Sequence, residues 1–131
     1  MSSLVAGKEI EPDARGNTCS ENGIANPDNI AFLPYYRILM IAEDTSKHAV
    51  AALWSLDTQR ASMERAMIAP PHAEFTGITW SPNLNGHGYL TVAVQHPWRA
   101  ETIEDTKLPE GITAEHQKSM TGYLGPFPPL D

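Results

Sequence analysis

The sequence predicts an all-β fold built from antiparallel strands. Its apolar residues fall into short runs of strand length, and turn-forming residues separate these runs at a spacing of roughly 8 to 12 residues, which is typical of antiparallel β-architecture. Eleven prolines among 131 residues interrupt the chain too often to favour long helices. The segment 91–95 alternates with a period of two, as a half-buried strand does.

Six apolar runs are predicted to be strands, and Pro, Asn, Asp and Gly residues occupy the connections because they favour turns. The predicted strands are 30–33, 38–42, 49–56, 63–68, 75–80 and 89–94. The predicted core side chains are Ile38, Met40, Leu53, Trp54, Phe75, Ile78, Trp80, Leu90, Val92 and Val94. We expect Trp98 at the surface and residues 99–121 as a polar loop, in which 113–120 could form one short helix.

The two halves of the chain have a similar order of predicted strands and turns. "NPDNIAFLPYYRILMIAED" and "EFTGITWSPNLNGHGYLTVAVQHP" each contain a strand, a turn with proline, a second strand and a polar end. Propellers repeat four-stranded units of about 40 to 50 residues in this way. The predicted fold is therefore about two blades of a β-propeller, a partial propeller that spans residues 1–131 as a single domain.

Composition narrows the possible partners. The formal net charge is -7, from 9 basic and 16 acidic residues, so nucleic acid and anionic membrane surfaces are not expected partners. No apolar run reaches the roughly 18 residues that a membrane-spanning helix needs. The single cysteine, Cys19, has no partner for an internal disulfide and is predicted to be a small buried side chain.

Several familiar catalytic patterns are missing from the sequence. The spacing of the five histidines matches no zinc template. No Gly-x-Ser-x-Gly elbow is present, and "NGHGY" at 85–89 is a hairpin turn rather than a phosphate-binding loop.

The acid pair Glu43 and Asp44 follows a strand that is otherwise apolar. Two neighbouring carboxylates repel each other unless a cation or a basic partner compensates them, and calcium binds six to eight oxygen ligands of this kind. We therefore expect both acids to be calcium ligands. In the alternative, Asp44 caps the following turn while Glu43 pairs with Lys47 or an arginine.

Other polar residues lie at the ends of predicted strands. Asp28 and Asn29 offer further oxygen atoms on a Pro turn, although such residues also favour turns for their own backbone hydrogen bonds. His48 suits calcium poorly as a ligand and is expected in a second shell around the site. Gln95 and His96 end a strand, where they could contact substrate or cap the turn.

Four segments resemble the C-terminal portion of the PhoX family of bacterial alkaline phosphatases: "NPDNIAFLP", "IAEDTSKH", "TGITWSPNLNGHGYLTVAVQHPW" and "GYLGPFPPLD". The resemblance covers residues 3–131. It implies a calcium-dependent phosphomonoesterase on a β-propeller, with a calcium and iron cluster at the axis and export by the twin-arginine route, hence a periplasmic or secreted location. It places Glu74 near the metal cluster.

The resemblance also implies that much of the active site lies elsewhere. The family's iron-ligating cysteine and phosphate-binding arginine belong to earlier parts of longer chains, so iron is not assigned to Cys19. The chain is expected to contribute metal-ligand carboxylates to the hydrolysis of a phosphate monoester and to be inactive alone. After the His-Pro, "WRAETIEDTKLPEGITAEHQKSM" departs from the family pattern.

Two other hypotheses remain open from the sequence. The chain could be a catalytically silent calcium-binding remnant. It could also be a non-catalytic binding or assembly module, because two blades cannot close a ring and open strand edges pair with another chain or with a second copy.

Overall fold

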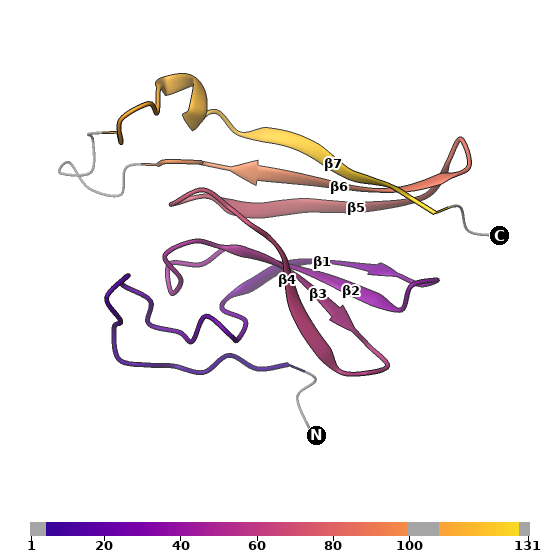
Figure 1. Ribbon diagram of the computed structural model, residues 1–131, viewed down its shortest axis with the longest axis horizontal. Coiled ribbons are helices and arrows are strands. Elements are labelled where there is room, and N and C mark those ends of the chain that lie inside the picture. The colour runs from indigo at the N-terminus through magenta and orange to yellow at the C-terminus, as the bar shows by residue number, and fades with distance from the viewer. Residues whose placement is uncertain (1–4, 100–107, 129–131) are drawn as a thin grey trace.

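The computed structural model, which describes residues 5–99 and 108–128, contains two antiparallel sheets stacked face to face (Figure 1). The first sheet has the strand order β1-β2-β3-β4, and the second has the order β5-β6-β7. The strands are β1 (Pro27–Leu33), β2 (Ile38–Glu43), β3 (Ala52–Asp57), β4 (Ser62–Ile68), β5 (Glu74–Leu84), β6 (His87–Gln95) and β7 (Met120–Phe127). Each sheet is a meander, since neighbouring strands follow one another along the chain.

Turn chemistry explains the hairpins. Asn85 and Gly86 connect β5 to β6 with φ angles of 52° and 83°, which is the Asn-Gly combination that suits a tight hairpin. Between β3 and β4 the Asp57 carboxylate accepts the backbone N–H groups of Gln59 and Arg60 at 2.9 and 3.0 Å. These local bonds fix the registers on which the packing of the sheets depends.

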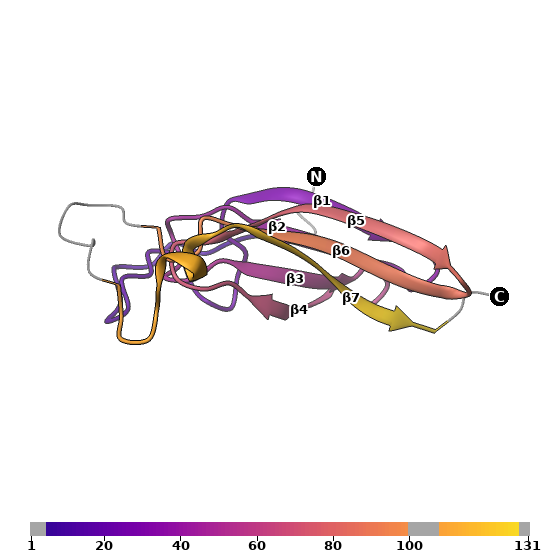
Figure 2. The same ribbon diagram turned by 90° about the horizontal axis from the view of Figure 1, so that it is seen from above.

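The main core lies between the two sheets. Successive residues of β2 point to opposite faces, so Met40 and Ala42 pack toward the second sheet. The fully buried core side chains there are contributed by both sheets and by the link between them: Leu33, Met40, Ala42, Ala51, Leu53, Ala69, Ala73, Phe75, Leu90 and Val92. The sheets approach each other most closely along β1 and β5, which lie side by side in the view from above (Figure 2).

The opposite face of the first sheet is covered by residues 5–25, which we call the N-terminal segment. Ile24 packs there against Trp54 and Leu56 in a second apolar cluster, and Val5 adds to it. The Arg65 guanidinium lies over the Trp54 ring, 5.3 Å from its centre, and donates to the backbone oxygen of Glu21. The central strands β2 and β3 are thus covered on both faces, whereas β1 and β4 remain largely exposed.

The structure confirms the all-β prediction and all six predicted strands. It also contains β7, which the sequence analysis assigned in part to the polar loop. The short helix expected at 113–120 is a single 3-10 turn, Ala114–Gln117, and residues 100–107 of the loop lie outside the described residues. Trp98 is half-buried rather than at the surface. No closed propeller is present in the described part of the chain.

The packing between the sheets predicts the effect of truncating its largest fully buried side chain, Phe75. Phe75 is 0% exposed, so Phe75→Ala leaves a cavity and should cost about 3–5 kcal/mol of the free energy of unfolding. Ile30 on β1 is 65% exposed, and Ile30→Ala should cost less than about 0.5 kcal/mol. Urea unfolding of both variants checks this, and equal losses would contradict the assigned core.

Candidate functional site

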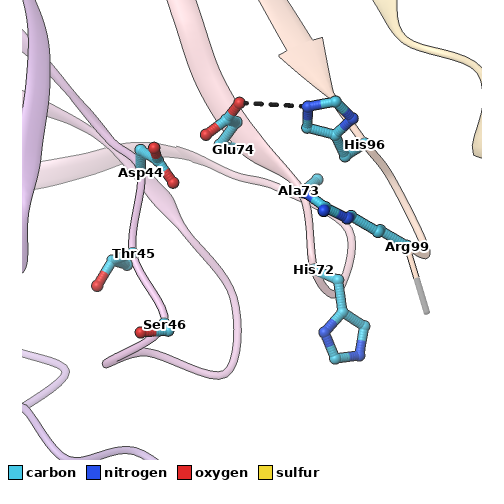
Figure 3. Close-up of a pocket in the computed structure, with 8 residues that line it drawn as sticks. All are labelled: Asp44, Thr45, Ser46, His72, Ala73, Glu74, His96 and Arg99. Atoms are coloured by element: carbon cyan, nitrogen blue, oxygen red, sulfur yellow. Dashed lines mark ion pairs between the residues drawn. The ribbon is translucent and has the colours of Figure 1, made fainter. Parts of the chain in front are cut away.

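A polar pocket of about 350 Å³ forms where three strand ends meet. The loop after β2, the start of β5 with the residues before it, and the loop after β6 each contribute to its lining. Figure 3 shows the carboxyl groups of Asp44 and Glu74 facing each other, whereas Thr45, Ser46 and His72 point away from them. The lining residues are Asp44, Thr45, Ser46, His72, Ala73, Glu74, His96 and Arg99. The residues that line the pocket thus lie mainly in loops at one end of the two sheets, which is a common place for binding and catalytic groups.

The pairing register of β5 and β6 determines the positions of Glu74 and His96, which form one side of the pocket. Glu74 pairs with Gln95, which brings the next residue, His96, beside the Glu74 side chain. His96 Nε2 lies 3.7 Å from Glu74 Oε1, as the dashed line in Figure 3 marks. The Trp98 N–H donates to the Pro71 carbonyl at 2.9 Å, so the two loops are also joined through their backbones.

Three residues in these two loops adopt left-handed backbone conformations that L-residues other than glycine seldom adopt. The φ angles are 61° at His72, 53° at His96 and 59° at Trp98. Such conformations are less stable than ordinary ones and cluster at functional sites. Their concentration around one pocket marks it as the leading candidate for the site.

Glu74 has unusual electrostatics. Its side chain is only 19% exposed, and burial raises the pKa of its carboxyl from the ordinary value of 4.5 to about 7. A hydrogen bond with Asp44 and the negative charges of Asp44 and Asp28 raise the pKa further, while Arg99 opposes the shift. Near neutral pH, the Glu74 carboxyl is therefore only partly ionised.

Glu43 does not line this pocket. Its carboxylate is 0% exposed and is surrounded by hydrogen-bonding partners. Oε1 accepts from the Ala25 N–H at 2.8 Å and from Trp54 Nε1 at 2.7 Å. Oε2 accepts from the Ala52 N–H at 2.9 Å and lies 3.1 Å from His48 Nδ1. Lys47, the alternative partner expected for Glu43, lies instead 3.6 Å from Glu9.

The structure brings together some of the other predicted site residues and separates others. Asp28 is exposed at the start of β1, in a bulge between Pro27 and Asn29, and its charge acts on Glu74. The Asn29 amide donates to Asp28. Gln95 is half-buried at the end of β6 and is absent from the pocket lining. His48 is buried behind the loop, beside Glu43.

Sequence reasoning missed four polar residues of the pocket: Thr45, Ser46, His72 and Arg99. For two of them, His72 and Arg99, the flanking sequence was the available signal. His72 follows Pro70-Pro71, and Arg99 follows His96-Pro97-Trp98, so both are in Pro-rich connections at strand ends. Loops of this kind often carry functional side chains.

The described residues do not form a complete metal centre. No group of three His, Cys, Asp or Glu side chains within 5–99 and 108–128 is placed so that it could hold a metal ion. The hydrogen-bonded carboxyls of Asp44 and Glu74 nevertheless fit a hard cation in their chemistry, because their negative charges are close and only partly compensated.

Comparison with protein-family models, with curated protein sequences and with solved structures finds no match to this chain. In the part of the chain that the structure describes, the helical content is too short to include an apolar helix that could cross a membrane.

The raised pKa of Glu74 predicts how stability depends on pH. Between pH 4.5 and about pH 7 the carboxyl ionises in the unfolded chain while it stays protonated in the fold, so the folded state binds more protons. The contribution of Glu74 to stability is therefore fully present below pH 4.5, falls as the pH rises to about 7, and is constant above that. After a discount for solvent screening, the loss should be about 1 kcal/mol.

Glu74→Gln is the matched variant, because it keeps the shape and removes the titration. Urea unfolding from pH 4 to 8 without divalent cations should show a smaller decline for this variant than for the wild type, with the difference confined to this pH window. Parallel curves for the two proteins would show that Glu74 titrates normally.

Proposed function

We propose that this chain supplies carboxylate ligands to the calcium site of a phosphomonoesterase of the type that it resembles. Asp44 and Glu74 would be the ligands, with Asp28 as a third acid nearby. The observation that carries the proposal is that Asp44 and Glu74 line the same pocket, where burial and the neighbouring acid raise the pKa of Glu74 to about 7. A divalent cation would remove this repulsion and hold both groups ionised.

The rest of the pocket agrees with a cation that binds an anionic substrate. Calcium needs six to eight oxygen atoms, and Thr45 and Ser46 line the pocket next to Asp44. His96 and Arg99 line the pocket as potential positive groups. When bound, calcium would neutralise and orient a phosphate monoester. The missing ligands would come from residues outside this chain, so the chain would be inactive alone.

The sheets support the proposed partial propeller. The first sheet is a four-stranded meander, as a propeller blade is, and the second contains three strands in the same order. In a propeller the innermost strands of adjacent blades lie next to the axis. Here β1 and β5 are the closest strands of the two sheets, and Asp28 and Glu74 lie at the starts of these strands (Figure 2).

A specific observation favours a second function, that of an assembly module. Three large apolar side chains are exposed on β1 and the turn that follows it: Ile30 (65%), Phe32 (51%) and Tyr35 (66%). The four edge strands β1, β4, β5 and β7 each pair on one side only within the described residues. Exposed apolar surface beside open strand edges favours association with another chain or a second copy.

The calcium proposal predicts a thermal shift that depends on the two acids. A ligand that binds only the folded state stabilises it by about 2.7 kcal/mol at a hundredfold excess over its dissociation constant, so calcium should raise the melting temperature of the wild type. Glu74→Gln and Asp44→Asn should lose most of this rise. Calorimetry with and without calcium measures it, on the chain or on its assembly with the rest of a propeller.

Asp57→Asn is the control, because Asp57 caps the turn between β3 and β4 and is absent from the pocket lining. It should lower stability slightly at every calcium concentration and keep the full calcium response. An equal response in the wild type, Glu74→Gln and Asp44→Asn would reject these residues as ligands.

The assembly function predicts concentration-dependent association through β1. Replacing both Ile30 and Phe32 by Ser should shift the chain toward monomer in analytical ultracentrifugation. Leu84→Ser should not, although Leu84 is similarly exposed at 57%. A wild type that stays monomeric at high concentration would contradict this function and leave the calcium proposal unaffected.

A further inference from the structure

The loop from Asp44 to Ala49, which we call the site loop, is held by the N-terminal segment. The backbone N–H groups of Thr18 and Cys19 both donate to the Lys47 carbonyl, at 2.9 and 3.2 Å. The Asn17 side chain accepts from the Ala49 N–H through Oδ1 at 2.7 Å. The site loop contains no strand or helix, so these contacts take the place of secondary structure.

Asn17 is buried at this position and held there by hydrogen bonds to Asp13. It is 0% exposed, and its amide nitrogen donates to Asp13 Oδ2 at 2.8 Å, which fixes the orientation of its oxygen toward Ala49. Asp13 also accepts the Asn17 N–H through Oδ1 at 2.9 Å. Loss of the Asn17 side chain would leave the Ala49 N–H without its acceptor, which is costly for a buried polar group.

Glu43 joins three parts of the chain immediately before Asp44. Its carboxylate accepts from Ala25 at the end of the N-terminal segment and from Ala52 and Trp54 on β3. It also contacts His48 in the site loop, whose other ring nitrogen lies 3.3 Å from the Ser20 carbonyl. A single side chain thereby ties the first sheet, the N-terminal segment and the site loop together.

The backbone of Asp44 itself is fixed from the same side. Its N–H donates to the Asn26 carbonyl at 3.2 Å. Asp44 is exposed at the pocket, whereas Glu43 is fully buried on the other side of the loop. The N-terminal segment and the adjoining Asn26 therefore hold Asp44 and the residues on either side of it, although none of them lines the pocket.

We infer that Glu43 and Asn17 are positioning residues, which hold the site loop so that the Asp44 carboxylate stays against Glu74. The N-terminal segment is then part of the functional site, although only Asp44, Thr45 and Ser46 of the loop reach the pocket. This inference deepens the proposed calcium site and depends on that proposal only where calcium affinity is the readout. Outer contacts of this kind commonly set metal affinity by orienting the ligands.

The test compares Asn17→Ala and Glu43→Gln with Leu56→Val. Asn17→Ala removes the acceptor for Ala49, and Glu43→Gln keeps the size of the side chain while it removes one accepting oxygen. Leu56 is fully buried in β3, packs with Ile24 in the second apolar cluster and does not line the pocket, so it controls both for loss of stability and for loss of apolar packing under the N-terminal segment. Urea unfolding measures that loss for each variant.

Two readouts then separate positioning from stability. Carbon-13 NMR of the Glu74 side chain in metal-free protein reports the proximity of Asp44, and calorimetric titration with calcium chloride reports affinity. We expect Glu74 to titrate at a lower pH in both site variants and calcium to bind about 10-fold more weakly. The Leu56→Val variant should match the wild type in both.

Unchanged titration of Glu74 and unchanged affinity in folded Asn17→Ala and Glu43→Gln would overturn the inference. If Asn17→Ala fails to fold, Asn17→Ser provides the same comparison with a smaller loss. A wild type that binds no calcium, combined with a shifted Glu74 titration in the variants, would reject the proposed function and support the positioning roles.

Discussion

The buried carboxylate of Glu43 is the interaction on which the arrangement of this protein depends. A carboxylate that is 0% exposed is strongly destabilising unless hydrogen bonds replace its lost water. Its partners come from β3, from the end of the N-terminal segment and from the site loop, so the charge is satisfied only when all three have assembled. Glu43 therefore selects one packing of the N-terminal segment on the first sheet, which apolar contacts alone would fix less strictly.

A second constraint is the approach of β1 to β5. The sheets pack through a shared apolar core, and this packing brings together the starts of β1 and β5 with the end of β2. Asp28, Asp44 and Glu74 carry their charges to that point. Their mutual repulsion opposes the packing, and the apolar core offsets it. A raised pKa at a strand-end pocket makes Glu74 a candidate for a functional site.

The sequence predicted the first six strands because their apolar runs and turn residues are local signals. It did not predict β7, since Gly122, Gly125 and Pro126 are all poor strand formers and β7 depends on pairing with β6. The convergence of Asp44 with Glu74 was expected from the resemblance, but the geometry depends on packing between sheets. The burial of Glu43 required knowledge of Ala25 and Trp54, which lie 18 residues before and 11 after it.

The contrast between Glu43 and Asp44 follows from the strand that they end. Side chains alternate along β2, so adjacent acids point to opposite sides: Glu43 enters the interior beneath the N-terminal segment, and Asp44 reaches the pocket. The interior acid is compensated by N–H donors, whereas the pocket acid faces another carboxyl, Glu74. The buried N–H donors compensate Glu43, whereas at the proposed calcium site an external cation would compensate Asp44. This division of roles between two neighbouring residues supports the proposal that the pocket binds positive charge.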